Sequence, residues 1–139
     1  NNFNGSDSFE FTVSDGEISD TASVSLSVNA VNDAPVLASV SDVSFDEDGS
    51  GSTSISASDV DGDDLDFSIS GGTDITATLD GSSVSFSAPA NYNGSENFTV
   101  AVTDGALSDS QIITVTVNAV NDAPILASIG DRSMDEDGK

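Results

Sequence analysis

Residues 98–117 read FTVAVTDGALSDSQIITVTV, and this stretch decides the fold. Apolar side chains alternate with Thr and Ala in two runs, one on each side of Asp104-Gly105. A period of two predicts a strand with one buried face, whereas an amphipathic helix would repeat every 3.6 residues. Asp-Gly is a turn signal between such runs. The stretch therefore predicts two strands joined by a turn, each with an apolar face toward a core.

The same alternation returns in shorter runs along the chain. Turn signals such as Asp61-Gly62, Gly71-Gly72 and Asp80-Gly81 separate these runs, and no stretch shows helical spacing. About seven short strands with frequent Gly and Asp turns indicate an all-β, Greek-key, seven-stranded β-sandwich. The further positions expected to face the core are Val43, Phe45, Ile55, Ala57, Leu65, Phe67, Ile69, Ile75, Ala77, Leu79, Val84 and Phe86.

The chain repeats itself with a period of 89 residues. Residues 2–50 align with residues 91–139 without a gap, and 27 of these 49 positions are identical. This period is too long for one coil of a solenoid and suits one whole β-sandwich. The repetition therefore predicts a tandem array of sandwich domains.

The prolines of the recurring phrase Val-Asn-Ala-Val-Asn-Asp-Ala-Pro mark the predicted boundaries. Pro35 and Pro124 suit linkers, because a proline cannot donate to a central strand ladder. We expect residues 1–33 to be the last two strands of a preceding repeat, residues 34–122 one complete repeat, and residues 123–139 the first strand of a following repeat.

The composition is strongly acidic and excludes several classes of function. The chain has 25 Asp and Glu against two basic residues, no His and no Cys, with a formal net charge of −23. Nucleic acid and anionic membrane surfaces repel such a chain, so neither is an expected partner. Catalytic triads and thiol nucleophiles are excluded, and no feature indicates a carboxylate pair in a sugar cleft, so we expect no enzyme. Acidity alone would serve solubility, but the clustering of the acids indicates a more specific role.

Acidic residues gather where the predicted strands end. Asp59 and Asp61 lie in the turn after the second predicted strand, Asp104 in the turn after the sixth, and Asn32 and Asp33 in the linker. In strands that alternate in direction, these two turns fall at the end where the linker enters, so we expect the side chains to converge. Two carboxylates about 5 Å apart repel by roughly 3 kcal/mol at an effective dielectric near 20. Ca²⁺ would relieve this repulsion, because it takes six to eight oxygen ligands in irregular geometry, whereas zinc and copper favour His and Cys.

Several phrases resemble the repeats of cadherins. Residues 57–69 (ASDVDGDDLDFSI) resemble the cadherin Asp-x-Asp segment, and Asn32-Asp33-Ala34-Pro35 resembles the cadherin linker. Glu47 lies where cadherins carry the glutamate of their first strand, and Val102-Thr-Asp104-Gly105 resembles the remaining aspartate motif. The phrases Asn-Tyr/Phe-Asn-Gly, Val-x-Asp-Gly and Val-Asn-Asp-Ala-Pro make the whole chain similar to the cadherin-like tandem repeats of giant bacterial surface proteins and adhesins.

This resemblance implies a cadherin-like or Ig-like extracellular sandwich with Ca²⁺ at the junctions between repeats. The extra linker Asn and the middle Asp-x-Glu motif of animal cadherins are absent, which implies fewer ions at each junction. The implied ligands at the entry of the complete repeat are Asn32, Asp33, Asp59, Asp61 and Asp104, and those at its exit are Glu47, Asn121 and Asp122.

The expected function is that of a structural spacer in an extracellular surface protein, adhesin or fibre. Its partners would be neighbouring repeats of the same chain or identical copies. The alternative is an adhesion module that binds a glycan or protein ligand, or that makes homophilic contacts between repeats. The aromatics outside the predicted strand cores are Phe3 and Tyr92, both in the recurring Asn-x-Asn-Gly phrase. A feature present in every repeat favours the structural role.

Overall fold

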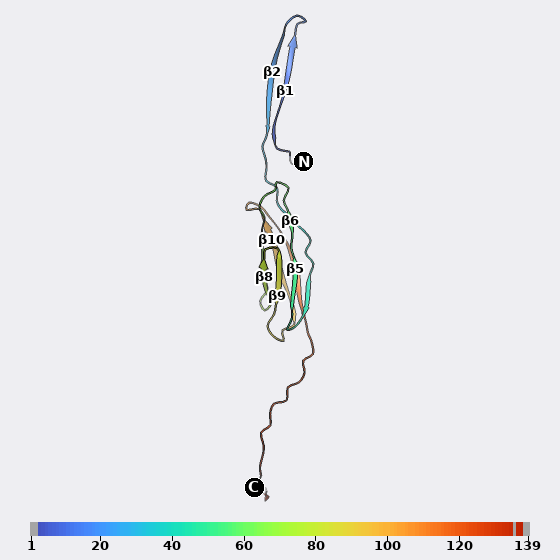
Figure 1. Ribbon diagram of the computed structural model, residues 1–139, viewed down its shortest axis with the longest axis vertical. Coiled ribbons are helices and arrows are strands. Elements are labelled where there is room, and N and C mark those ends of the chain that lie inside the picture. Colours follow the sequence, from blue (N-terminus) through green and yellow to red (C-terminus); the bar gives the residue numbers. More distant parts are fainter. Residues whose placement is uncertain (1–2, 135, 138–139) are drawn as a thin grey trace.

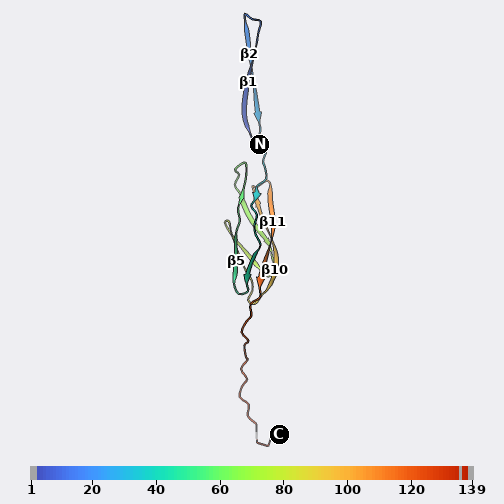
Figure 2. The ribbon, with the colours of Figure 1, turned by 90° about the vertical axis from the view of Figure 1, so that its right-hand side faces the viewer.

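The computed structural model describes residues 3–134, 136 and 137, and every regular element among them is a β-strand. A hairpin, a β-sandwich and an extended tail follow one another along the long axis (Figures 1 and 2). The hairpin consists of β1 (Gly5–Ser14) and β2 (Ser19–Val28), which pair antiparallel. Within the described residues, no helix has the length and apolar character needed to cross a membrane.

Two facing sheets form the sandwich. The four-stranded sheet has the order β4 (Val43–Asp46), β11 (Ser108–Asn118), β10 (Gly94–Thr103), β7 (Asp66–Gly71). The three-stranded sheet has the order β5 (Ser50–Ser54), β9 (Ser83–Ser87), β8 (Thr76–Asp80). A short pair, β3 (Val36–Leu37) with β6 (Ala57–Ser58), completes the fold. The all-β sandwich predicted from the sequence is confirmed.

The seven predicted strands appear as nine segments, because two of them change pairing partner midway. The first strand pairs with β6 as β3 and then crosses to the other sheet, where β4 runs parallel to β11. The second pairs with β9 as β5 and then with β3 as β6. The alternation of apolar and polar side chains cannot reveal a change of pairing partner. In the second strand, for example, the alternation continues through the buried Ile55, which lies between β5 and β6.

The core lies between the two sheets and confirms the predicted parity. Rings of Phe86 and Phe98 meet edge to face at its centre, with centroids 5.3 Å apart and planes at 67°. Val40, which the sequence analysis did not place in the core, is buried where the chain crosses between sheets. The remaining predicted positions are buried or pack half-buried against the core: Val43, Phe45, Ile55, Ala57, Leu65, Phe67, Ile69, Ile75, Ala77, Leu79, Val84, Val100, Val102, Ile113, Val115 and Val117.

Side chains of β11 satisfy the backbone of the crossing segment, residues 37–42. Gln111 accepts the Val40 N–H (3.1 Å) and donates to the Val40 carbonyl (2.6 Å). Asp109 accepts the Leu37 N–H at 2.9 Å. Buried backbone groups outside a ladder need such partners, so this strand can leave one sheet for the other at little cost.

A carboxylate in β10 plays the same part for the loop between β7 and β8. Glu96, half-buried, accepts N–H groups from Thr73 (2.8 Å), Asp74 (3.1 Å) and Ile75 (3.1 Å). The Thr73 N–H is the main cause that lowers the pKa of Glu96, partly offset by desolvation and reinforced by the other two amides and the Tyr92 hydroxyl.

The hairpin β1–β2 repeats the pairing of β10–β11 at the 89-residue offset. Phe9 faces Val24 across the hairpin as Phe98 faces Ile113 in the sandwich. The turn residue Asp15 accepts the N–H groups of Glu17 and Ile18, as its counterpart in the sandwich does for Ala106 and Leu107.

In the tail, residues 123–134 form no strand. The equivalent segment of the sandwich becomes β4 by pairing with β11, and the described part of the tail has no such neighbour. The division into a preceding, a complete and a following repeat therefore stays a prediction.

Candidate metal centre

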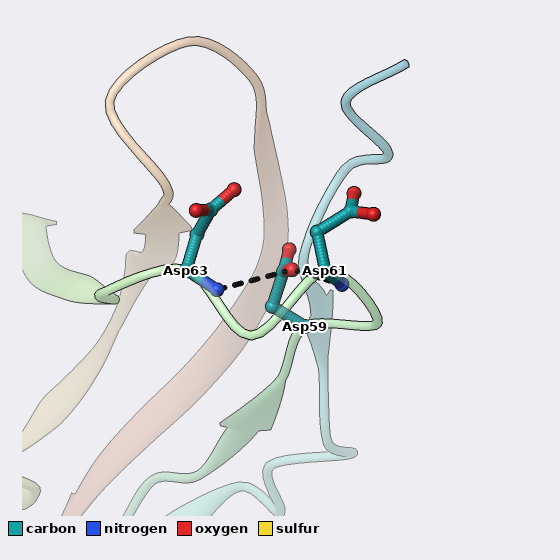
Figure 3. A group of neighbouring side chains, drawn as sticks. All are labelled: Asp59, Asp61 and Asp63. Carbon is teal, nitrogen blue, oxygen red and sulfur yellow. Dashed lines mark hydrogen bonds between the residues drawn. The ribbon is translucent and has the colours of Figure 1, made fainter. Parts of the chain in front are cut away.

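The loop between β6 and β7 gathers three carboxylates at the entry end of the sandwich. Asp59 Oδ1 accepts the N–H groups of Asp61 (2.8 Å), Gly62 (3.1 Å) and Asp63 (3.5 Å). Gly62 has φ +82°, a left-handed conformation that glycine adopts without strain and that lets the loop fold back on itself. As a result, the side chains of Asp59, Asp61 and Asp63 extend to the same side of the loop, with carboxylate oxygens within 4.8 Å of one another (Figure 3).

Hydrogen bonds tie the linker to this loop and to the turn after β10. Asp61 Oδ2 accepts the Asp33 N–H at 2.8 Å. Asn32 Nδ2 donates to Asp104 Oδ2 at 2.8 Å and to the Asp33 carbonyl at 3.2 Å. The five residues that the sequence predicted to converge at the entry are thus brought together.

Two carboxyl groups of this region, those of Asp104 and Asp63, have opposite pKa shifts. The pKa of Asp104 is lowered, first by the N–H of Leu107, then by the Asn32 amide and the N–H of Ala106. The pKa of Asp63 is raised, first by desolvation and then by the negative charges of neighbouring carboxylates, Asp59 foremost. The fold therefore favours the ionised form of Asp104 and, while no cation is near, disfavours the ionised form of Asp63, each relative to a free Asp.

One oxygen of the cluster is buried without a partner. Asp59 Oδ2 is shielded from solvent and has no hydrogen bond within the described part of the chain. A buried anionic oxygen without a partner is costly, and a cation would satisfy it. Ligand oxygens at 2.3–2.6 Å from one Ca²⁺ can lie up to about 5 Å apart, so the 4.8 Å limit of this group fits a calcium ion.

Two residues of this region were not among the predicted ligands. Asp63 belongs to the alternating series Asp59-x-Asp61-x-Asp63, and that spacing was the available signal. Asn4, which precedes β1, lines two hollows of about 210 and 320 Å³ together with Asp61, one of them also bordered by Asp33 and the other by Asp63. Its recurrence as Asn93 in the Asn-x-Asn-Gly phrase was the available signal.

At the opposite end of the sandwich, Glu47 is hydrogen-bonded to the exit linker. Glu47 Oε1 accepts the Val120 N–H at 2.6 Å, and the Glu47 N–H donates to the Asn118 carbonyl at 2.9 Å. Asn121 donates to the Asp122 carbonyl at 3.0 Å, as Asn32 does to Asp33 in the entry linker. The two linkers therefore share this local hydrogen bond.

The structure thus sorts the predicted ligands into an entry group and an exit group, and their role in binding a metal stays a prediction. The entry group is Asn32, Asp33, Asp59, Asp61 and Asp104, and the exit group is Glu47, Asn121 and Asp122.

The solved structures similar to this chain include three of endo-fucoidan hydrolases. A variant of the endo-fucoidan hydrolase MfFcnA4 from glycoside hydrolase family 107 is 26% identical, with a TM-score of 0.49 over 85% of this chain and 19% of that chain. A second structure of MfFcnA4 gives 22% identity and a TM-score of 0.45 over the same shares. The endo-fucoidan hydrolase MfFcnA9 gives 20% identity and a TM-score of 0.42 over 83% of this chain and 22% of that chain. The chain spans about a fifth of the length of these enzymes.

A comparison with curated proteins found no match. A family model described as bacterial Ig domain matches residues 32–117, from the entry linker to the penultimate residue of β11. Domains of this family are commonly extracellular or on the cell surface. The matched segment contains the crossing strand, both sheets and the acidic loop of the entry. The chain therefore belongs to the bacterial Ig domain family.

Proposed function

We propose that the sandwich is a cadherin-like spacer repeat of an extracellular surface protein, adhesin or fibre, stiffened by Ca²⁺ where it meets the preceding repeat. One observation carries the proposal: the loop gathers the carboxylates of Asp59, Asp61 and Asp63, one of whose oxygens, Asp59 Oδ2, is buried without a partner in the described part of the chain. Hydrogen bonds tie the linker to this loop and to the turn after β10. Membership of the bacterial Ig domain family supports the broader part, an extracellular structural or adhesion module.

The residues of the cluster are suited to couple the linker to the sandwich. The linker is held there by exposed hydrogen bonds from Asp33 and Asn32, and such bonds are individually weak. Desolvation and, after it, the negative charges of neighbouring carboxylates raise the pKa of Asp63, and this repulsion between carboxylates opposes the closed arrangement. Bound Ca²⁺ would neutralise the carboxylates and join oxygens of the loop, the turn and the linker. The acidic loop would then hold the linker most rigidly in calcium-rich surroundings.

The test is thermal unfolding by circular dichroism in chelator and in 5 mM calcium. Extracellular calcium modules bind at about 0.1–1 mM, so at roughly ten times a 0.5 mM Kd each site contributes about 1.4 kcal/mol. For a domain of this size the melting temperature should rise by about 6–11 °C for each ion. Magnesium at the same concentration controls for charge screening and should give a smaller rise, because it demands octahedral geometry and keeps its waters.

Matched variants locate the effect. Asp61→Asn removes a carboxylate of the cluster and should abolish most of the calcium-dependent rise. Asp80→Asn removes an exposed carboxylate at the end of β8, outside the cluster, and should leave the rise unchanged. A melting temperature that is the same in chelator and calcium would overturn the proposal.

The alternative, a ligand- or glycan-binding adhesion module, rests on one observation. Phe3 is exposed and lines the hollow beside Asp33 and Asp61. Its counterpart in the sandwich, Tyr92, packs half-buried against the core, so the position has a structural use when its sandwich is complete. This favours the spacer role. Binding of the calcium-loaded chain to a glycan array would favour the alternative.

A further inference from the structure

One face of the hairpin β1–β2 is apolar and exposed to solvent. Phe9, Phe11 and Leu26 have 53%, 55% and 49% of their surface exposed. Val13 and Val28 extend the same face, and the polar residues Glu10, Thr12 and Ser27 occupy the positions between these residues. In both ribbon views the hairpin projects beyond the sandwich, with no further strand beside it (Figures 1 and 2). A two-stranded hairpin with an uncovered apolar face is marginally stable in water, so this surface requires a partner.

The sandwich shows what covers the equivalent face. The counterparts of Phe9, Phe11 and Leu26 at the 89-residue offset are Phe98, Val100 and Val115, which are at most 1% exposed. Both hairpins have the same register, so these side chains occupy corresponding points on corresponding strands. In the sandwich, β7 pairs with the outer edge of β10, β4 pairs in parallel with the outer edge of β11, and Phe86 of β9 contacts Phe98 across the core.

We infer that the hairpin is an interaction surface for the rest of a second sandwich, and that its partner is a polypeptide with the chemistry of residues 34–90. This partner supplies a parallel strand to the free edge of β2, an antiparallel strand to the free edge of β1, and a three-stranded sheet over the apolar face. Backbone hydrogen bonds at both edges and apolar contacts on one face specify it together. The inference rests on the repeat and the exposed face and does not depend on calcium.

Differences in size between the two faces make the surface selective. Phe11 and Leu26 are larger than their counterparts Val100 and Val115, whereas Val24 is smaller than Ile113. Close packing penalises both overfilling and cavities. The partner therefore has smaller side chains opposite Phe11 and Leu26 than the sandwich has opposite Val100 and Val115.

The experiment supplies the proposed partner by duplicating residues 34–90. Residues 34–90 are fused directly before residue 2 of the full chain, so that position 90 leads into residue 2 as it leads into residue 91. Hydrogen exchange is measured for the amides of β1 and β2. In the fusion they should exchange about 10³-fold more slowly than in the unfused chain, because they join a cooperative sandwich. A second fusion carries Phe11→Val, Val24→Ile and Leu26→Val, which restore the apolar side chains that the sandwich has at these three positions, and should protect at least as well.

Two outcomes would overturn the inference. One is that both fusions leave the hairpin amides exchanging as fast as in the unfused chain. The other is that sedimentation shows the unfused chain self-associating with its hairpin already protected, since the partner would then be a second copy. Each fusion is compared with the unfused chain twice, once in chelator and once in calcium. The present inference predicts slower exchange in the fusion in both buffers, whereas the calcium proposal concerns only the difference between the two buffers.

Discussion

Replacing Glu96 should destabilise the sandwich, although the alternation pattern gives this residue no special role. The loss in the free energy of unfolding follows from three hydrogen bonds. Glu96 accepts the N–H groups of Thr73, Asp74 and Ile75, which lead the chain from one sheet to the other. Glu96→Ala leaves all three amides without their acceptor.

The three amides differ in whether water can replace the lost acceptor. Thr73 and Asp74 are exposed, so water replaces the carboxylate and each lost bond costs about 0.5–1 kcal/mol. Ile75 is 3% exposed, so its N–H bears a desolvation penalty of about 1–2 kcal/mol. The sum is about 3 kcal/mol, or a melting temperature lower by about 12–24 °C for a domain of this size. Glu96→Gln keeps one acceptor oxygen and should cost about half as much.

Urea unfolding followed by circular dichroism measures the cost, and Tyr92, the single tyrosine in a chain without tryptophan, provides a second probe by fluorescence. Asp80→Asn, in an exposed position on β8, is the control and should stay within about 0.5 kcal/mol of the parent. The lowered pKa of Glu96 fixes the dependence on pH: its stabilisation is complete above the unfolded value near 4.5 and is lost as the pH falls through the folded pKa. The gap between parent and Glu96→Gln should therefore narrow in acid. A Glu96→Ala variant as stable as the control would refute the reasoning.

Three further perturbations probe the core, a loop and the acidic cluster. Phe86→Ala, at a 1% exposed position in edge contact with Phe98, should cost about 3–5 kcal/mol by calorimetry, whereas truncating an exposed aliphatic residue should cost under about 0.5 kcal/mol. Gly72→Ala should lower the free energy of unfolding in urea by about 2–3 kcal/mol, because φ is +74° and the new Cβ would lie 2.5 Å from the Ile75 carbonyl oxygen. Gly81→Ala, at φ +59° with open space around it, should lower it by only about 1 kcal/mol. The raised pKa of Asp63 means that, in chelator, stability falls as the pH rises through that pKa. Asp63→Asn should therefore melt higher than the parent at pH 7 in chelator and gain less from calcium, and an equal gain would separate Asp63 from the site.

The sequence could predict the features that depend on local period and on counting strands. The alternation of Phe98 and Val100 with polar residues specified β10 and its buried face. The placement of Asp61 and Asp104 at the same end of the sandwich, where both accept from the linker, followed from alternate strand directions, because turns separated by an even number of strands share an end. The internal repeat identified the hairpin as a second copy of β10–β11.

The remaining features depend on contacts between residues far apart in the chain. The break between β3 and β4 exists because Gln111 and Asp109 satisfy a segment about seventy positions earlier. From the sequence alone, Glu96 is predicted to be a solvated residue of an alternating strand. Its role as acceptor for the loop between β7 and β8 becomes apparent only in the folded structure. Asp59 has one oxygen that accepts backbone N–H groups and one that is buried without a partner among the described residues. This arrangement depends on the fold of the whole entry end, which local sequence does not specify.

The parallel pairing of β4 with β11 determines how a repeat would bear mechanical force. Four residue pairs join the two strands, from Val43 with Val115 to Asp46 with Asn118. One strand follows the entry linker and the other leads into the exit linker, so pulling the linkers apart slides the strands past each other. Their hydrogen bonds then share the load at once, whereas antiparallel strands pulled from one end would open one bond at a time. The backbone groups of Thr114 and Asn118 face the β4 edge, since the Thr114 N–H donates to Asp42 and the Asn118 carbonyl accepts from Glu47, and Thr116 lies between them on the same side. We expect single-molecule pulling to show a high unfolding force that falls when Thr116→Pro removes a donor from this pair. A sandwich built this way would act as a tension-bearing link, and in an array every repeat would carry the same load.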